Sequence, residues 1–474
     1  MVDLYRLFNP RGIAIVGASR EPNKIGSVIL RNLIEAGYEG KIYPINPNAQ
    51  EIMGLKAYPS ISAVEGTVDV AVISVPAPKV PDVIEDAGKA GVKFAVVIAS
   101  GFKEVGNVAL EEEVVKRAKK YGMRVVGPNV FGYVYTPSKI NTTFGPNDII
   151  PGNVAFISQS GALGVALMGT ASVEGLGISA IISIGNKADL DDSDFIEYLG
   201  DDPNTNLILI YMEGISEGQR FMEVASKVSL KKPIIIIKSG RSEAGARAAA
   251  SHTGSLAGNY SLYKSAFRQS GILLAETIEQ AFDWAKALAW NPLPKGDNVV
   301  IITNGGGAGV QATDALADYG ITLRRISDTL AANLKQILPP FASLGNPIDL
   351  TGLANAEWYY QSISLALDDP NVDSLVVIYC RTGMTDPKEI AGAIKDALKS
   401  SKNRKPITVA MIGGEAEYEA MRELTREHIP TYPTPERASA SMGAIYRYYY
   451  AKKYVEERLK ELDKKKLTAL ERIR

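Results

Sequence analysis

The sequence predicts an α/β protein with three consecutive domains built on parallel sheets. Two observations support this fold class. Short β-branched runs alternate with helical patterns almost throughout the chain, which is typical of βαβ units. The chain also has 474 residues, about three times the length of a common domain. We expect the domains to span residues 1–145, 146–293 and 294–474, with a proline-containing linker at residues 291–296.

Composition and charge exclude several classes of protein. Lys and Arg number 52 against 53 Asp and Glu, so no basic excess indicates a nucleic-acid partner. The single cysteine, Cys380, excludes an intramolecular disulfide and a cysteine-rich zinc site, and it suits a reducing compartment. The first ten residues lack a signal-peptide core, and no apolar run reaches membrane-spanning length. We expect a cytoplasmic protein with no membrane or nucleic-acid partner, and we assign no metal ligand.

In the first domain, a turn of small residues joins the first expected strand, 12–16, to a helix. Gly17-Ala18-Ser19 follows the strand, and Lys24 and Gly26 come at the start of the helix. Such a turn exposes backbone N–H groups at the positive end of a helix, where phosphates bind. The fingerprint G-x-G-x-x-G is absent, and the second strand ends in Asn46-Pro47 instead of an acidic residue, which argues against NAD. The alternative is that the glycines only close a tight turn.

Three more strands of this domain are expected at 68–75, 93–98 and 124–126, and each ends in small or polar residues. These are Ser74-Val75-Pro76, Ser100-Gly101, and Asn129 in Gly127-Pro128-Asn129. Ligands of open parallel sheets bind beyond the carboxyl ends of the strands. The first domain is therefore expected to bind a phosphate-bearing nucleotide at that edge.

The second domain is expected to have strands at 154–157, 178–184, 207–212 and 233–238. Its first strand runs through Ser158-Gln159-Ser160-Gly161 directly into a helix, where amides and hydroxyls would hold a phosphate. The alternative there is ordinary helix capping by Ser160. Glu213 follows the third strand, and its alternative is a carboxylate in solvent.

His252 is one of only two histidines, and it lies in a run of small residues between Gly240 and Ser255. Such a run has little with which to anchor itself to a core, so we expect a mobile loop. Neutral imidazole is a good nucleophile towards phosphorus near neutral pH. The alternative is a helical segment with a satisfied histidine. The other histidine, His428, is expected on a helix surface.

The third domain is expected to have strands at 299–302, 375–379 and 407–411. Its first strand runs into Asn304-Gly305-Gly306-Gly307 and then a helix, which repeats the arrangement at residues 158–161. Three consecutive glycines allow a ligand close approach to the backbone. We therefore predict a second phosphate-binding turn at this position.

Together these motifs resemble the succinyl-CoA synthetase superfamily, and their order is most similar to the α subunits of ADP-forming acetyl-CoA synthetases. The resemblance implies a Rossmann-like CoA-binding domain followed by two flavodoxin-like ligase domains. It implies a phosphohistidine at His252, oriented by Glu213. It also implies that phosphate binds at Ser158, Gln159, Ser160, Gly161, Asn304, Gly305, Gly306 and Gly307, and that CoA binds at Gly17, Ala18, Ser19, Lys24, Gly26, Asn46, Pro47, Ser74, Val75, Pro76, Ser100, Gly101 and Asn129.

The implied reaction interconverts acyl-CoA, ADP and phosphate with the acid, CoA and ATP, through an acyl phosphate. CoA or acetyl-CoA and phosphate are the expected substrates in this chain. The chain has no G-x-x-x-x-G-K-[ST] loop, and no part of it reads as an ATP-grasp module. The resemblance therefore places ADP or ATP with Mg²⁺ in a separate β subunit carrying an ATP-grasp domain, in an α2β2 heterotetramer. The acyl group, and ADP against GDP, stay open.

Three other readings remain at this point. The first is a CoA-binding regulatory protein without catalysis, in which His252 is only structural. The second is an NAD-dependent dehydrogenase, and the third is a fragment of a related protein acetyltransferase.

Overall fold

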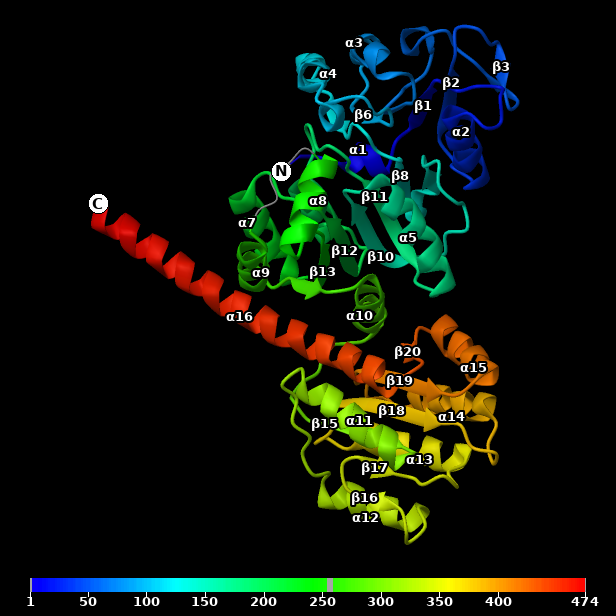
Figure 1. The fold of residues 1–474 in the computed structure, drawn as a ribbon, viewed down its shortest axis with the longest axis vertical. Helices are drawn as coiled ribbons and strands as arrows, with labels where there is room; N and C mark the ends of the chain where they lie inside the picture. The colour runs from blue at the N-terminus through cyan, green and yellow to red at the C-terminus, as the bar shows by residue number, and fades with distance from the viewer. Residues whose placement is uncertain (1, 254–258, 474) are drawn as a thin grey trace. The chain divides into compact units, whose positions relative to one another are not determined.

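The structure is a computed structural model that describes residues 2–253 and 259–473, with side chains described for residues 2–248 and 259–464. The chain folds as two compact units, Met1–Glu276 and Thr277–Arg474 (Figure 1). Unit 1 holds a five-stranded and a seven-stranded sheet, and unit 2 holds a six-stranded sheet. Helices alternate with strands throughout, so the predicted α/β class is confirmed. The predicted domain boundaries at 145/146 and 293/294 stay predictions.

The first sheet of unit 1 has the order β2-β1-β5-β6-β7, and all its strands are parallel. The chain winds in opposite directions from β1, so a topological switch point lies between β1 and β5, where ligands of such sheets bind. The elements are α1 (Tyr5–Phe8), β1 (Gly12–Val16), α2 (Ile25–Glu35), β2 (Lys41–Ile45), the hairpin β3 (Glu51–Ile52) and β4 (Leu55–Lys56), β5 (Val70–Ile73), α3 (Val80–Lys89), β6 (Phe94–Val97), α4 (Val108–Lys120) and β7 (Arg124–Val126).

The second sheet has the order β14-β13-β12-β10-β11-β8-β9, with its switch point between β10 and β12. Its strands β10 to β14 are parallel, whereas β8 pairs antiparallel with β11. The elements are β8 (Tyr133–Tyr135), β9 (Ile140–Asn141), β10 (Pro151–Ser158), α5 (Gly161–Val173), β11 (Ile178–Ser183), α6 (Asp192–Asp201), β12 (Leu207–Met212), α7 (Gly218–Ser229), β13 (Ile234–Lys238), α8 (Glu243–Thr253), α9 (Tyr260–Gln269) and β14 (Leu273–Ala275).

One apolar core joins the two sheets of unit 1. Phe8 of α1 stacks on Tyr198 of α6 with ring centroids 4.5 Å apart, and the Tyr133 hydroxyl donates to the Leu7 carbonyl at 2.8 Å. Arg124 at the start of β7 forms a bidentate pair with Asp189, which precedes α6. These contacts fix the first sheet relative to the second sheet.

Unit 2 has the sheet order β16-β17-β15-β18-β19-β20, with its switch point between β15 and β18. The long helix α16 packs its first half on this unit, and its second half extends away from the sheet (Figure 1). No helix in the described part of the chain is both long and apolar enough to span a membrane. The elements are α10 (Ile278–Trp290), β15 (Val299–Thr303), α11 (Gly306–Ala317), α12 (Asp328–Ile337), β16 (Ser343–Leu344), β17 (Ile348–Asp349), α13 (Ala356–Asp368), β18 (Ser374–Cys380), α14 (Pro387–Ser400), β19 (Ile407–Ile412), α15 (Glu415–Arg426), β20 (Thr431–Tyr432) and α16 (Pro435–Ile473).

Candidate active site

The turn after β1 is shaped by close contact between two glycines. A Cβ on Gly26 would lie 2.2 Å from the Gly17 carbonyl oxygen, and Gly17 has a φ of +92°, so a side chain fits at neither position. Asn46, after β2, donates from Nδ2 to the Ala18 carbonyl at 2.7 Å. The Ser19 hydroxyl accepts from the Glu21 amide at 3.1 Å. The turn therefore holds the start of α2 directly above the switch point.

The other predicted CoA-binding residues lie along the same edge of the sheet. Ser74 donates from Oγ to the Val16 carbonyl at 2.9 Å, which joins the turn after β5 to the turn after β1. The Asn129 amide donates to the Ala99 carbonyl at 3.0 Å, which joins the ends of β7 and β6. Lys24 is exposed at the start of α2, 3.7 Å from Glu21. Pro47, Val75, Pro76, Ser100 and Gly101 lie in the loops of this edge, half-buried or exposed.

The turn between β10 and α5 is closed by a serine hydroxyl. Ser158 Oγ donates to the Ser160 carbonyl at 2.7 Å and accepts from the Ser160 amide at 3.2 Å. Ser160 makes no side-chain cap to α5, so the capping alternative is not what this serine does. In the described part of the chain, the amides of Gly161, Ala162 and Leu163 have no acceptor. The start of α5 therefore presents amides and the Ser160 hydroxyl to an anion.

Gln159 is buried and is fully occupied within the protein. Its Oε1 accepts from the amides of Glu213 and Gly214, and its Nε2 donates to Asp192 and to the Gly214 carbonyl. Its own amide donates to the Tyr211 carbonyl at 3.2 Å. Gln159 therefore has no donor left for a phosphate, and it joins the α5 turn to the loop that carries Glu213.

Two lysines that the sequence analysis missed flank the same loop, and one is buried and the other largely buried. Lys187 lies after β11 and Lys238 ends β13, on either side of the end of β12. Burial lowers the pKa of Lys238 to about 8. Lys238 directly follows four isoleucines and lies at the same sheet edge as Glu213. A lysine at the end of so apolar a strand is unusual, and this pattern could have identified it from the sequence.

The segment around His252 differs from the expected loop, because residues 243–253 form helix α8. The small residues that suggested weak anchoring are mostly alanines, which are the strongest helix formers. The side chain of His252 lies outside the described residues. The structure therefore gives no distance between His252 and Glu213, and the roles of both residues stay predictions.

The turn between β15 and α11 in unit 2 has the same hydroxyl and amide pattern. Thr303 Oγ1 donates to the Gly305 carbonyl at 3.1 Å and accepts from the Gly305 amide at 3.0 Å. Asn304 exchanges two hydrogen bonds with the main chain of Cys380, at 2.9 and 2.7 Å. A Cβ on Gly306 would lie 2.9 Å from Asp349 Oδ2, whereas Gly307 faces open space.

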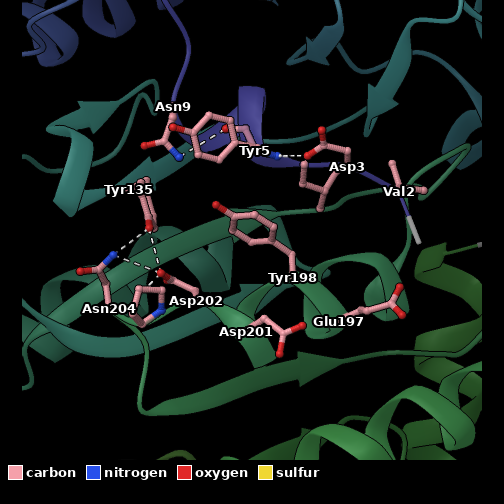
Figure 2. A pocket seen from close by; sticks show the side chains of 12 residues that line it. Val2, Asp3, Tyr5, Asn9, Tyr135, Glu197, Tyr198, Asp201, Asp202 and Asn204 are labelled. Carbon is pink, nitrogen blue, oxygen red and sulfur yellow. Dashed lines mark hydrogen bonds between the residues drawn. The ribbon is translucent and has the colours of Figure 1, made fainter.

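A separate cavity of about 490 Å³ lies in unit 1, and none of the predicted site residues lines it (Figure 2). Figure 2 shows Tyr135, Asp202 and Asn204 joined by hydrogen bonds in its wall, with Tyr198 beside them. Asp202 and Asn204 precede β12, so the cavity lies at the amino end of that strand. Glu213 is at the opposite end, and the cavity is therefore no part of the candidate active site.

Comparison with known proteins identifies the family to which the chain belongs. Three family models match in order: a CoA binding domain over residues 11–136, a succinyl-CoA ligase like flavodoxin domain over 151–288, and a Ligase-CoA domain over 299–456. The α subunit of acetate–CoA ligase (ADP-forming) I of Pyrococcus furiosus is 52% identical over 453 residues, which cover 94% of this chain and 98% of that protein.

Two further relatives match over almost all of this chain. Acetate–CoA ligase (ADP-forming) I of Archaeoglobus fulgidus is 40% identical over 96% of this chain, which covers only 65% of that longer protein. The solved structure of the dinucleotide forming acetyl-coenzyme A synthetase 1 of Ca. Korarchaeum cryptofilum, in complex with phosphate and ADP, matches with a TM-score of 0.96 and 60% identity. That match covers 97% of this chain and 99% of the other.

Proposed function

Because the chain belongs to the family of α subunits of ADP-forming acetate–CoA ligases, we propose that it interconverts acyl-CoA, phosphate and ADP with the acid, CoA and ATP through a phosphoryl group on His252. The observation that carries this proposal is the match over nearly the whole length to such an α subunit. The geometry adds support, because the loop with Glu213 and the amide-lined start of α5 lie at one switch point.

CoA binds along the carboxyl edge of the first sheet in this proposal. The amides of the Gly17 turn and the start of α2 contact its phosphates, and Lys24 adds a positive charge at the surface. The residues after β5, β6 and β7 flank the rest of the molecule. No side chain stands at Gly17 or Gly26, so the CoA phosphates reach the backbone.

Two transfers follow in the direction that forms ATP. A phosphate oxygen attacks the thioester carbonyl, the C–S bond breaks, and CoA leaves with a proton, which gives the acyl phosphate. A ring nitrogen of His252 then attacks the phosphorus, the bond to the acyl oxygen breaks, and the carboxylate leaves. Glu213 accepts a hydrogen bond from the other ring nitrogen, and the amides at Gly161 stabilise the charge on the transferring group.

A third transfer, from His252 to ADP, needs a partner. The chain covers 65% of the longer Archaeoglobus relative but 98% of the Pyrococcus α subunit, and this supports a partner subunit that carries the rest. We assign ADP and Mg²⁺ to a β subunit with an ATP-grasp domain, in a cytoplasmic α2β2 enzyme, with Asn304–Gly307 as a second phosphate-binding turn. Mg²⁺ neutralises charge on the nucleotide phosphates.

Mass spectrometry of His252 tests this proposal directly. The full chain is incubated with acetyl-CoA, phosphate and Mg²⁺, with and without the β subunit, beside the His252→Ala variant. A phosphoryl group on His252 in the wild type alone is the expected result. Absence of that group in both conditions, with CoA still bound, would reduce the chain to a CoA-binding regulatory protein.

A further inference from the structure

Each backbone polar group of the Glu213–Gly214 turn is held by a side chain that is buried or largely buried. Both amides donate to Gln159 Oε1, at 2.7 and 2.9 Å. The Glu213 carbonyl accepts from Lys238 Nζ at 2.8 Å, and the Gly214 carbonyl accepts from Lys187 Nζ at 2.7 Å. Gln159 follows β10, Lys238 ends β13, and Lys187 lies in the loop after β11. The turn is therefore tied to the strand on each side of it.

The two lysines differ in how their charge is balanced. Lys187 forms an ion pair with buried Asp192 at 2.9 Å. Lys238 is 9% exposed and makes no ion pair with any described residue. Its ammonium instead donates to the carbonyls of Glu213 and Ser239, and it lies 4.6 Å from the ring centroid of Tyr263. A buried ammonium that is held by neutral carbonyls is costly, and side chains of this kind cluster at functional sites.

We propose that Lys238 is a positioning residue for phosphoryl transfer, acting by holding the main chain of Glu213 so that its carboxylate orients His252. This inference rests on the proposed roles of Glu213 and His252. Lys187 and Gln159 hold the other half of the turn. Tyr263 of α9 covers the ammonium from the opposite side.

The charge of Lys238 gives this arrangement a pH dependence. The groups that face it are Glu213 after β12, which raises its pKa, and Lys187, which lowers it, with Tyr263 contributing a ring. Burial is the largest cause, and it sets the pKa at about 8. As the pH rises through 8, the ammonium loses a donor and its charge, so Glu213 is held less firmly. Lys238→Arg keeps the charge at every pH of the assay.

Lys238→Met is the variant that tests the inference, and Lys232→Met is its matched control. Lys232 also donates to two carbonyls, those of Leu199 and Asp202, and burial also lowers its pKa. It precedes β13, however, whereas Lys238 ends that strand. Rapid-quench measurement of phosphohistidine formation, in the full chain with its β subunit added, gives the rate and the KM for acetyl-CoA.

We expect Lys238→Met to lower the rate about 10- to 100-fold, the cost of displacing a catalytic group, with the KM for acetyl-CoA within about twofold. Lys232→Met should stay within about twofold of wild type. Because Lys238 acts through Glu213, Lys238→Met should add almost nothing in a Glu213→Gln background. Lys238→Arg should keep most of the rate. Its rate should not decrease above pH 8, whereas the wild-type rate should.

Two results would overturn the inference while leaving the proposed function intact. One is a wild-type rate in Lys238→Met, and the other is an equal loss in the wild-type and Glu213→Gln backgrounds. Melting and CoA binding show whether Lys238→Met folds. If it does not, the pH dependence of the rate in Lys238→Arg decides. A rate that decreases above pH 8 as in the wild type overturns the inference. A wild-type chain that forms no phosphohistidine removes the proposed function and this inference together.

Discussion

The two units of this chain share a framework at one end of their sheets and differ at the other end. Both contain Asp-Asp-Pro-Asn between a helix and the next strand, at residues 201–204 and 368–371. In each unit the asparagine amide donates to the second aspartate, and a lysine before a later strand donates to two carbonyls at the end of the helix. These contacts join Asn204 to Asp202, Lys232 to Leu199 and Asp202, Asn371 to Asp369, and Lys405 to Ala366 and Asp369.

At the carboxyl ends of the strands the likeness is only partial. In both turns a hydroxyl group bonds to the main chain two residues further on, and the side-chain amide of the next residue reaches the neighbouring strand. In unit 1 that amide, Gln159, reaches a loop that carries a carboxylate and accepts hydrogen bonds from two lysines. In unit 2 Asn304 reaches only the main chain of Cys380, and β19 ends in Ile412 where β13 ends in Lys238. The repeated contacts serve folding, and the charges added in unit 1 indicate where the chemistry is done.

The largest expected effect separates the two histidines, one in each unit. His252→Asn should abolish turnover, because the amide cannot form the phosphoryl intermediate. His428→Asn should leave turnover unchanged. His428 has a φ of +57° after α15 and packs on Trp290, and asparagine also adopts that conformation. A coupled assay of ATP formation measures both, and turnover by His252→Asn would refute the central step.

The next effect compares the amides of the two turns. Gln159→Met and Asn304→Leu each leave two part-buried main-chain groups without their side-chain partner, so both should lower stability, by about 1 kcal/mol for each lost hydrogen bond. Only Gln159→Met should also lower kcat, about 10- to 100-fold, because it alone frees the Glu213 loop. Steady-state kinetics on folded protein measures this.

The control for that comparison is the melting temperature of each variant, measured beside its kcat. Equal losses of kcat at equal stability would show that the two turns contribute alike to catalysis. The proposed difference between the units would then be wrong.

A smaller effect compares a glycine in each turn. In Gly306→Ala the new Cβ would lie 2.9 Å from Asp349 Oδ2, so the end of that side chain must shift, which offsets part of the helix propensity that alanine adds. Gly161 faces open space, so Gly161→Ala should gain up to about 1 kcal/mol in helix propensity. If phosphate approaches the Gly161 amide, the same methyl group should raise the KM for phosphate. A more stable Gly161→Ala variant with an unchanged KM would place the phosphate elsewhere.

Much of the fold followed from patterns in single segments. The β-branched runs at β1, β10 and β15 predicted parallel strands, and parallel strands bring their carboxyl ends to one edge. For that reason the sequence alone was enough to group Gly17, Asn46 and Ser74, and their contacts agree with the grouping.

Other features depend on tertiary contacts that a sequence pattern does not contain. β8 is three residues long, too short for a period to show, and it exists because β11 offers a free edge. The side chains that hold the Glu213–Gly214 turn belong to residues 159, 187 and 238. These residues are far apart in the chain, and the order of the strands in the sheet brings them together. The predicted loop at His252 was wrong because alanine weakens packing but favours a helix.

The smallest expected effect is a difference in how stability responds to pH. Burial lowers the pKa of Lys238 to about 8 in the folded chain, against 10.5 for an ordinary lysine. Between these two values the unfolded chain holds a proton that the folded chain lacks, so this group makes the protein more stable as the pH rises.

Lys238→Met removes that contribution. The wild type should therefore gain stability relative to Lys238→Met from pH 8 to pH 10, seen as slower hydrogen exchange in peptides of β12 and β13 after correction for the intrinsic rate. Peptides of β18 and β19 in unit 2 provide the internal control, because Lys238→Met should leave their exchange unchanged at every pH. A constant difference between the two proteins across this range would mean that Lys238 keeps an ordinary pKa, and the alkaline fall in phosphoryl transfer would then need another group.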